Sequence, residues 1–412
     1  MEIVLRKGGL SMTVGIIGAG ASGMAAALAA AENAQTRVIL MERQSRVGRK
    51  LLATGNGRCN LTNLHAMESG YHGDPLFISG ILDQLSPEQT LDWFSRLGLY
   101  TTAEPSGRVY PYSDQANSVV DVLRFALEKP NITLKLGFEV EKVRKSTSGF
   151  LVEAQQERVE CDALIIACGG LAGTRLGGSM SGYKLLRSLG HRCTRLRPAL
   201  VQLQSNWPYC PALKGVRANC HAGILRNGEL FAESTGEIQF TQFGLSGPVM
   251  FEVSRDACQG PGSWSCSLDL LPDLDEKQVL DAVSTRVSLP VSELFTGILH
   301  NRLGRVVAQC ANLRLTDAVG ELEDWQLVQA AHTAKHLEVP LTEPMGMDAA
   351  QVTAGGIVTR EFDEKTLESR LVPGLYACGE VLDVDGDCGG YNLQWAWSSG
   401  YVAGKNAGGN TK

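Results

Sequence analysis

Three glycines near the start of the chain have a spacing that suits the binding of a dinucleotide. Gly18, Gly20 and Gly23 form a Gly-x-Gly-x-x-Gly motif. The first glycine allows a tight turn, the second lets the backbone approach a pyrophosphate, and the third lets a helix pack closely on a strand. The N-terminus of that helix then faces the phosphate charge. We therefore predict contacts with a dinucleotide from Gly18, Ala19, Gly20, Ala21, Ser22 and Gly23.

The motif stands in the strand–turn–helix–strand context that such a site needs. The apolar residues 14–17 predict a buried strand, and the Ala-rich run after the motif predicts a helix. The apolar residues 37–41 predict the next strand, which ends at Glu42, 22 residues beyond Gly20. A carboxylate at that place accepts hydrogen bonds from an adenosine ribose. We assign Glu42 and the neighbouring Arg43 to the cofactor site, and both FAD and NAD fit these features.

An irregular segment, residues 48–63, favours FAD. It is rich in glycines, amides and basic residues and has no helical or strand periodicity, as expected for a loop that wraps a polar ligand. Two adjacent basic residues are predicted to neutralise a diphosphate, and a Gly-Asn-Gly turn is predicted to bring backbone donors to a flavin ring or its ribityl chain. The alternative is a solvated turn that carries scattered charges. The predicted contacts are Arg49, Lys50, Gly55, Asn56 and Gly57.

Two later segments complete the predicted cofactor site. An apolar strand over residues 163–167 runs into a pair of glycines. Another strand ends at an acidic residue, and a second acid and a glycine-rich turn then precede a helix of small residues. One of these acids is predicted to hold the ribityl hydroxyls, and the helix N-terminus to stabilise negative charge on a reduced flavin. The predicted contacts are Gly169, Glu380, Asp385, Gly389, Gly390, Asn392 and Leu393.

The composition describes an ordinary globular protein, with 44% hydrophobic and 20% charged residues and a formal net charge of −6. The basic residues are scattered among a larger number of acids, so we predict no nucleic-acid partner. No run approaches the roughly 20 apolar residues of a membrane helix. Residues 1–11 lack the apolar core of a signal peptide. We therefore expect a cytoplasmic protein without a membrane span, in which residues 1–11 carry no function.

The cysteines and histidines give no sign of a metal centre. The eleven cysteines include no Cys-x-x-Cys pair, which argues against a zinc site, a disulfide framework and a dithiol redox centre. His65 and His72 have no suitably spaced partners, so no metal is predicted. Four cysteines adjoin the glycine motifs and are predicted to serve as small packing residues, namely Cys59, Cys168, Cys378 and Cys388.

Several motifs together resemble those of the BaiN-type bacterial flavoproteins, and the resemblance covers nearly the whole chain. They are residues 18–23, residues 48–60, residues 107–113 (Gly-Arg-Val-Tyr-Pro-Tyr-Ser), residues 243–248 (Phe-Gly-Leu-Ser-Gly-Pro) and residues 379–396, which include Gly-Gly-Tyr-Asn-Leu-Gln-Trp-Ala. The central loop and the C-terminal block are far more specific than the first glycine motif, which many oxidoreductases share.

The resemblance implies an α/β fold of the two-dinucleotide type, with a Rossmann-like FAD-binding domain that contains a β-rich insert and a small helical insert. Local patterns agree, because short alternating runs with turns continue to about residue 271 and helical periodicity follows. The expected division is 1–194 for the first part of the FAD domain, 195–271 for the β-rich insert, 272–344 for the helical insert and 345–412 for the second part of the FAD domain.

The resemblance also assigns one further contact and shows two departures. Val140 matches a position that contacts adenine through its backbone. Residues 167–170 read Ala-Cys-Gly-Gly where the family has Ala-Thr-Gly-Gly, and residues 177–183 depart from the usual Gly-Ser-Thr-Gly-Asp-Gly-Tyr. These changes leave FAD binding intact, and we assign no substrate role to residues 174–183.

The family includes a 3-dehydro-bile-acid Δ4,6-reductase and relatives described as aminoacetone oxidases. We favour the first activity, in which hydride from reduced flavin saturates ring double bonds conjugated to a steroid ketone. The expected substrate is therefore a small hydrophobic molecule of steroid type. No second Gly-x-Gly-x-x-Gly motif follows a later strand, so either NAD(P)H binds at the flavin site transiently, which we favour, or another donor reduces the flavin.

Other functions remain open at this point. They are an amino-ketone oxidase that uses oxygen, a flavin-binding sensor or scaffold without turnover, and an NAD-only dehydrogenase. No residue is assigned as the catalytic proton donor, although Tyr112 and Tyr391 lie close to the motifs. Arg58 fits either a substrate carboxylate or an anchor for its own loop. No oligomeric state is predicted.

Overall fold

The computed structural model describes residues 12–409, so residues 1–11, for which no function is expected, and residues 410–412 lie outside it. The chain divides into two compact units, and the first is built from both ends of the sequence. It comprises the residues up to Arg197 and those from Val352 onward, and the second unit is Pro198–Gln351. The finer four-part division stays a prediction. Among residues 12–409, no helix combines the length and apolar character needed to cross a lipid bilayer.

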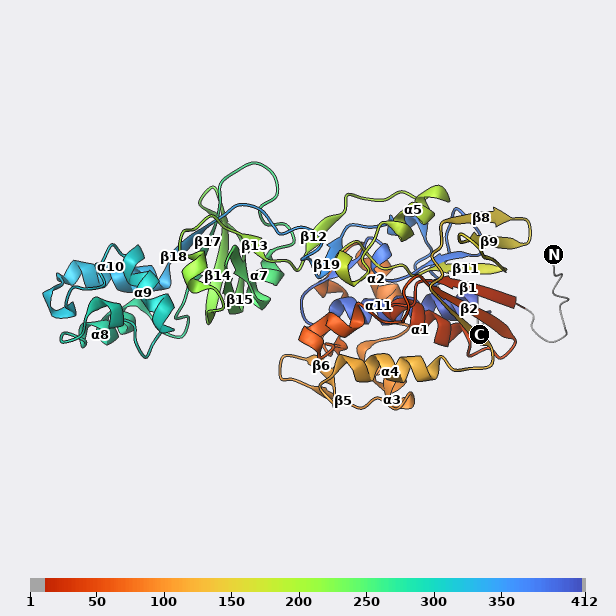
Figure 1. Ribbon diagram of the computed structural model, residues 1–412, viewed down its shortest axis with the longest axis horizontal. Coiled ribbons are helices and arrows are strands. Elements are labelled where there is room, and N and C mark those ends of the chain that lie inside the picture. Colours follow the sequence, from red (N-terminus) through yellow and green to blue (C-terminus); the bar gives the residue numbers. More distant parts are fainter. Residues whose placement is uncertain (1–11, 410–412) are drawn as a thin grey trace. The chain divides into compact units, whose positions relative to one another are not determined.

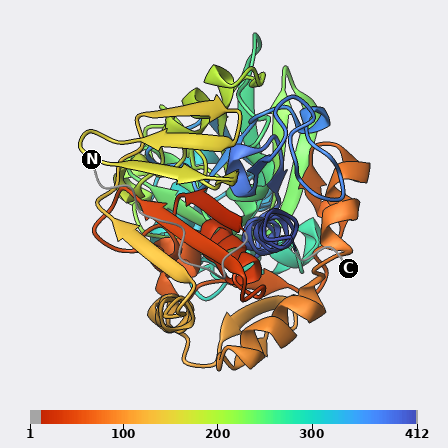
Figure 2. The ribbon, with the colours of Figure 1, turned by 90° about the vertical axis from the view of Figure 1, so that its right-hand side faces the viewer.

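A five-stranded parallel sheet forms the centre of the first unit (Figures 1 and 2). The strand order is β20-β11-β1-β2-β7, so β20, the last of these five strands in the chain, lies beside β11 from the first half of the chain. The inner strands read as continuous apolar runs because both faces of the sheet are buried. The strands are β1 (Met12–Ile17), β2 (Thr36–Glu42), β7 (Ile132–Leu136), β11 (Ala163–Ile166) and β20 (Leu375–Ala377).

Two helices from opposite ends of the chain, α1 (Ala21–Ala30) and α11 (Tyr391–Ala407), lie side by side against this sheet (Figure 2). Their backbones approach so closely that glycine is required on α11. A Cβ on Gly400 would lie 2.3 Å from the carbonyl oxygen of Ser22, and one on Gly404 would lie 2.2 Å from that of Ala26. Nine of the ten residues of α1 are buried, which explains why its sequence is Ala-rich and lacks a polar face.

Smaller elements surround the sheet. A three-stranded antiparallel sheet, β10-β9-β8, packs against the inner strands β1 and β11, and a second one, β3-β6-β5, lies near the loop of residues 48–63. The pair β21-β4 joins the C-terminal block to the N-terminal half. The bounds are β3 (Thr62–Asn63), β4 (Tyr71–His72), β5 (Thr101–Ala103), β6 (Arg108–Pro111), β8 (Lys142–Ser146), β9 (Gly149–Glu153), β10 (Arg158–Cys161), β12 (Arg197–Ala199), β19 (Val352–Ala354), β21 (Asp385–Gly386), α2 (Pro75–Leu82), α3 (Pro87–Arg96), α4 (Ala116–Ala126) and α5 (Ser181–Ser188).

The second unit has its own hydrophobic core and a six-stranded antiparallel sheet in the order β13-β16-β15-β14-β17-β18. Three helices, α8, α9 and α10, pack together beside this sheet (Figure 1). The bounds are β13 (Leu203–Gln204), β14 (Arg217–Arg226), β15 (Glu229–Thr241), β16 (Gly244–Ser246), β17 (Trp264–Asp269), β18 (Leu337–Leu341), α6 (Cys210–Leu213), α7 (Pro248–Val253), α8 (Glu276–Ser284), α9 (Asn301–Cys310) and α10 (Asp324–Lys335).

One strand, β18, falls inside the segment that the sequence predicts to be helical. Leu337, Val339 and Leu341 are buried, whereas Glu338 between them is exposed. This alternation has the period of two that a strand requires. The strand pairs with β17 and so brings the chain back into the sheet after the three helices.

A buried polar cluster joins two distant segments of the first unit. The His191 Nδ1 atom lies 3.0 Å from a carboxylate oxygen of Glu361, and its Nε2 atom lies 3.0 Å from the Ser369 hydroxyl. Desolvation by burial lowers the pKa of His191, although the hydrogen bond and charge of Glu361 oppose this shift. Burial alone would raise the pKa of Glu361, but hydrogen bonds from Arg192 and His191 outweigh it and lower that pKa.

We expect Gly404→Ala to destabilise the protein by about 1–3 kcal/mol, because the added methyl group would force α11 away from α1. The variant should melt at a lower temperature by circular dichroism. Gly236→Ala is the matched control, since a Cβ there meets only Val249 Cβ at 4.0 Å. Equal melting temperatures for the two variants would contradict the close packing of these helices.

We expect the buried cluster to make the protein sensitive to acid. The unfolded chain protonates His191 at pH values where the folded chain keeps it neutral, so stability falls as the pH drops below about 6.5. The depressed pKa of Glu361 acts in the same direction at lower pH, because stability is lost as that carboxylate is protonated. Urea denaturation at a series of pH values should show a flatter dependence for His191→Gln than for the control His221→Gln, which alters an exposed histidine.

Candidate cofactor site

The turn between β1 and α1 shows why each glycine of the first motif is needed. Gly18 has a φ of +104°, and a Cβ there would lie 2.4 Å from the carbonyl oxygen of Ala167. A Cβ on Gly23 would lie 1.8 Å from the carbonyl oxygen of Gly18. A Cβ on Gly20, by contrast, would meet no heavy atom within 4 Å. Two glycines therefore serve packing, and Gly20 borders open space at the N-terminus of α1, where a phosphate group fits.

Glu42 lies at the end of β2 and is held against this turn. One carboxylate oxygen accepts a hydrogen bond from the backbone of Ala19 at 2.8 Å, and the other accepts one from the backbone of Gln44 at 2.8 Å. Each carboxylate oxygen can accept more than one hydrogen bond. Glu42 is therefore oriented by the backbone and keeps acceptor capacity for ribose hydroxyls.

The segment that contains Val140 runs beside the same edge of the sheet. The backbone of Phe138 donates to the carbonyl oxygen of Glu42 at 2.9 Å, and that of Gly137 donates to the carbonyl oxygen of Gln44 at 3.1 Å. Val140 is partly buried against the core. The structure thus brings the predicted adenine contact close to the predicted ribose contact.

Two predicted arginines hold a neighbouring loop. Arg43 donates to the carbonyl oxygen of Gly177 at 2.5 Å. Arg49 donates to the side chain of Gln44 at 2.9 Å and to the carbonyl oxygen of Arg175 at 3.0 Å. Both guanidinium groups therefore fix residues 175–177 beside the glycine turn, a role that the sequence does not reveal.

Lys50 and Glu380 join the N-terminal loop to the C-terminal block. The Lys50 ammonium group lies 2.8 Å from one carboxylate oxygen of Glu380, and the other oxygen accepts a hydrogen bond from the backbone of Thr353 at 2.9 Å. A Cβ on Gly170 would lie 2.2 Å from this carboxylate, whereas one on Gly169 would meet nothing within 4 Å. A second open space therefore borders the backbone near this ion pair.

The loop of residues 55–57 has an unusual backbone. Gly55, Asn56 and Gly57 have φ values of 56°, 56° and 87°, which is the left-handed region that favours glycine and asparagine. A Cβ on Gly57 would meet nothing within 4 Å. The backbone at Gly57 thus borders open space, as expected of a loop that wraps a ligand.

Asn60, which sequence reasoning did not select, carries the clearest sign of a missing polar partner. Its side-chain oxygen is buried and accepts no hydrogen bond, although it lies 2.9 Å from the position of a Cβ on Gly390. An unsatisfied buried acceptor costs roughly 1–3 kcal/mol. A ligand donor at this place removes that cost, so the residues present fit a polar cofactor such as FAD.

The start of α11 is shaped by glycines. Gly390 has a φ of 106°, and a Cβ there would lie 2.4 Å from the carbonyl oxygen of Thr62. The Asn392 side chain accepts from the backbone of Gly386 at 2.9 Å and donates to its carbonyl oxygen at 2.7 Å. Asn392 therefore shapes the turn before the helix. Gly389, Asp385 and Leu393 lie in the same turn and first helical residues.

Arg58 has partners that suit an anchor for its loop. Its guanidinium carbon lies 3.9 Å from the centre of the Tyr110 ring, and the group donates to Glu104 and Asp114. The hydrogen bond with Asp114 is the main cause that raises the pKa of Arg58. The Tyr112 side chain is 77% exposed, and its surroundings give no sign of a catalytic role.

The cysteines near the site are suited to packing. All eleven cysteines are free. Burial raises the pKa of Cys59, Cys168 and Cys378 to about 12, so these thiols stay protonated at neutral pH. Cys388 is partly buried next to Gly389.

Comparison with known proteins places this site in a family. The model of the HI0933-like protein Rossmann domain matches residues 12–406. The chain belongs to this family. It is 40% identical over 404 residues to the 3-dehydro-bile acid delta(4,6)-reductase of Clostridium scindens, covering 96% of this chain and 98% of that protein. It is also 34% identical over 394 residues to the ribosomal RNA dihydrouridine synthase of Escherichia coli, covering 94% and 96%.

A solved structure shares the fold. The 3-ketosteroid delta1-dehydrogenase of Sterolibacterium denitrificans aligns with 97% of this chain and 100% of its own, with a TM-score of 0.53 and 13% identity. Such low identity shows the fold alone. The predictions of a Rossmann-type α/β fold and of membership in this flavoprotein family are confirmed.

Family membership makes the chain an FAD-dependent oxidoreductase. The prediction that excluded nucleic acid is in part wrong for this family, because two relatives are named as ribosomal RNA dihydrouridine synthases. The net charge of the whole chain does not describe the charge of the surface that binds a substrate. It therefore could not exclude a nucleic-acid substrate.

We expect Gly20→Val to separate folding from cofactor binding. The backbone of Gly20 is extended (φ −80°, ψ −166°) and a side chain there meets open space, so the variant should fold. The same side chain would occupy the space at the N-terminus of α1, and the affinity for FAD should fall at least about tenfold, or roughly 1.4 kcal/mol. Flavin absorbance and the far-ultraviolet circular dichroism spectrum measure the two properties. Gly23→Val is the contrasting variant, which should fail to fold; a yellow Gly20→Val protein would contradict this assignment.

Proposed function

We propose that this chain reduces a carbon–carbon double bond conjugated to a carbonyl group, and that its substrate is a small 3-oxo steroid of the bile-acid type. The observation that carries the proposal is the 40% identity, over nearly the full length of both chains, to a protein named as a reductase of such a compound. The alignment covers 96% of this chain and 98% of that protein, so it extends over both of the segments from which the candidate site is built.

The second relative supports the same class of reaction. Its name states that it forms dihydrouridine, and uridine becomes dihydrouridine when the ring double bond next to a carbonyl group is saturated. The reduction of a dienone and the reduction of a uracil ring are thus reactions of the same type. In both, the carbonyl oxygen gains negative charge as the neighbouring double bond is reduced, and stabilisation of that charge lowers the barrier.

Residues of this chain would bind the cofactor and stabilise its negative charge. We propose that Glu42 holds the adenosine ribose, that the turn at Gly20 faces the diphosphate, and that Lys50 and Glu380 lie at the polar part of the flavin. When bound, FAD supplies the hydride chemistry that protein side chains lack, with NAD(P)H as the proposed transient donor. The Asn60 oxygen would accept a hydrogen bond from the cofactor, which supplies the partner that this buried atom lacks.

The helix α11 would add electrostatic stabilisation. Its 17 residues begin directly after Gly390, with a Gly-Gly pair that keeps side chains away from the helix start. The first backbone N–H groups of a helix have no partners within the helix and carry partial positive charge. We propose that this N-terminus stabilises the negative charge of the reduced cofactor.

Charge favours a small substrate over ribosomal RNA. Residues 198–351 contain ten Lys and Arg against eighteen Asp and Glu, a formal net charge of −8 for the second unit. Proteins that bind RNA neutralise its phosphates with Lys and Arg. An acidic unit repels a polyanion, whereas a neutral ring system or one with a single carboxylate is far less affected.

Reduction of a uridine in ribosomal RNA is the second candidate function, and the 34% identity over 94% of the chain favours it. An amino-ketone oxidase and a flavin protein without turnover are further alternatives. The four differ in what reduces the flavin and in what reoxidises it, so one experiment separates them.

We expect anaerobic stopped-flow absorbance to show bleaching of the flavin by NADH or NADPH and its rapid recovery on addition of a 3-oxo-4,6-dienoyl steroid. A saturated 3-oxo steroid is the control and should leave the flavin reduced. Recovery only with ribosomal RNA, accompanied by dihydrouridine on mass spectrometry, would replace the steroid with a uridine. Bleaching by an amino ketone with recovery only by oxygen would establish the oxidase, and no reoxidation by any of these compounds would favour the sensor.

A further inference from the structure

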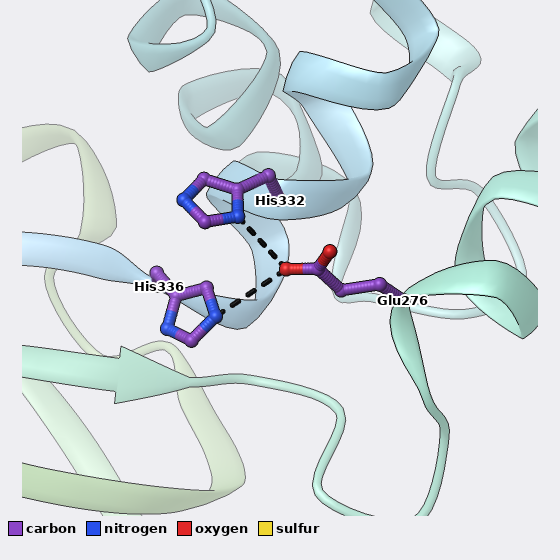
Figure 3. A group of neighbouring side chains, drawn as sticks. All are labelled: Glu276, His332 and His336. Carbon is purple, nitrogen blue, oxygen red and sulfur yellow. Dashed lines mark hydrogen bonds and ion pairs between the residues drawn. The ribbon is translucent and has the colours of Figure 1, made fainter.

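Three side chains of the second unit converge on one point at its surface (Figure 3). Glu276 is the first residue of α8. His332 lies in the last turn of α10, and His336 follows one turn later at the end of that helix. Figure 3 shows both imidazole rings turned toward the carboxylate of Glu276. The spacing of four residues puts the two histidines on one face of the helix.

The distances between these groups approach those of a metal site. His332 Nδ1 lies 2.8 Å and His336 Nε2 lies 3.4 Å from the same carboxylate oxygen of Glu276. All three potential ligand atoms lie within 4.8 Å of one another. Zinc bonds to nitrogen and oxygen are about 2.0–2.2 Å long, so ligand atoms of a tetrahedral site lie roughly 3.3–3.5 Å apart. Small side-chain rotations therefore suffice to place an ion among the three atoms.

The backbone positions of these residues are fixed by other interactions. The backbone of His336 donates to the carbonyl oxygen of His332 at 2.9 Å, which holds His336 one turn beyond His332 although its own backbone (φ −138°, ψ 48°) is no longer helical. Asp275 caps α8 by accepting from the backbone of Gln278 at 2.7 Å. These bonds hold Glu276 and the two histidines in place before any ion arrives.

Lys335, which lies between the two histidines in sequence, strengthens this frame. Its ammonium group is directed away from them, to Asp269 at 2.7 Å and to the carbonyl oxygen of Leu271 at 2.7 Å. It thereby ties the end of α10 to the segment just before α8. Asp269 pairs with the lysine charge and so reduces its repulsion of a cation at the histidines.

We propose that Glu276, His332 and His336 bind a zinc ion, with water in the fourth position. Two imidazole nitrogens and one carboxylate form a common zinc ligand set, and imidazole selects zinc and related transition metals over magnesium or calcium. The three side chains are 49–54% exposed, so an ion reaches them from solvent. The bound ion would link α8 to α10 and stabilise the second unit by mass action.

The sequence alone indicates only the two histidines of this site. His332 and His336 have a metal-compatible spacing, but Glu276 lies 56 residues before His332. The expectation that the chain has no metal site rested on the absence of paired cysteines and on two other histidines, which left this cluster out.

The test is calorimetric titration of the untagged, chelator-treated full chain with zinc chloride. We expect one zinc ion per chain, and we expect His332→Ala and His336→Ala each to weaken binding by more than the roughly 10–100-fold that loss of an outer-sphere partner costs. Glu276→Gln should weaken it as well. Bound cobalt(II) should give visible absorption bands in the parent protein and lose them in these variants.

His221→Ala is the matched control. His221 is also exposed and lies 3.3 Å from a carboxylate, that of Glu233, but it has no second imidazole beside it in the described chain. This variant should bind zinc as the parent does. Circular dichroism without metal verifies that each variant is folded. Absence of zinc binding by the parent, or unchanged binding by a His332→Ala/His336→Ala double variant, would show that the cluster is only an ion pair.

Discussion

The close approach of α1 and α11 is the constraint on which the rest of the first unit depends. Helix α1 carries the glycine turn at its N-terminus, yet its residues are almost all apolar and small, so it is stable only when another element covers it. That element is α11, and its glycines at positions 400 and 404 allow the two backbones to touch. The first glycine motif therefore needs the last helix of the chain before it can form a site.

The same constraint explains why the candidate site is assembled from distant parts of the sequence. Once α11 lies against α1, the turn before it comes next to the loop of residues 48–63, and the Asn63 side chain donates to the carbonyl oxygen of Gly389 at 3.0 Å. The Lys50–Glu380 pair spans 330 positions in the same way. The second unit lies between these segments in the sequence and has a hydrophobic core of its own, as expected of an inserted domain.

Local sequence patterns predicted those features of the candidate site that depend on local backbone geometry. The glycine motif, the strand that ends at Glu42 and the turn at Gly390 were readable because backbone conformation and short-range packing dictate those residue types. The role of Asn60 could not be predicted from the sequence, because its side-chain oxygen is buried without a hydrogen-bond partner only in the folded chain, where Gly390 lies beside it. Arg43 and Arg49 were predicted as cofactor contacts from the sequence, whereas their hydrogen bonds to a loop more than 100 residues away depend on the tertiary structure.

The division into two units also bears on how relatives with different names can share one fold. A dienone and a uracil ring both need a hydride beside a carbonyl group, so the residues that hold the flavin can stay the same for either substrate. Those residues lie in the first unit, which supplies every predicted cofactor contact. Selection between a small steroid and a polyanion must then come from residues outside that set.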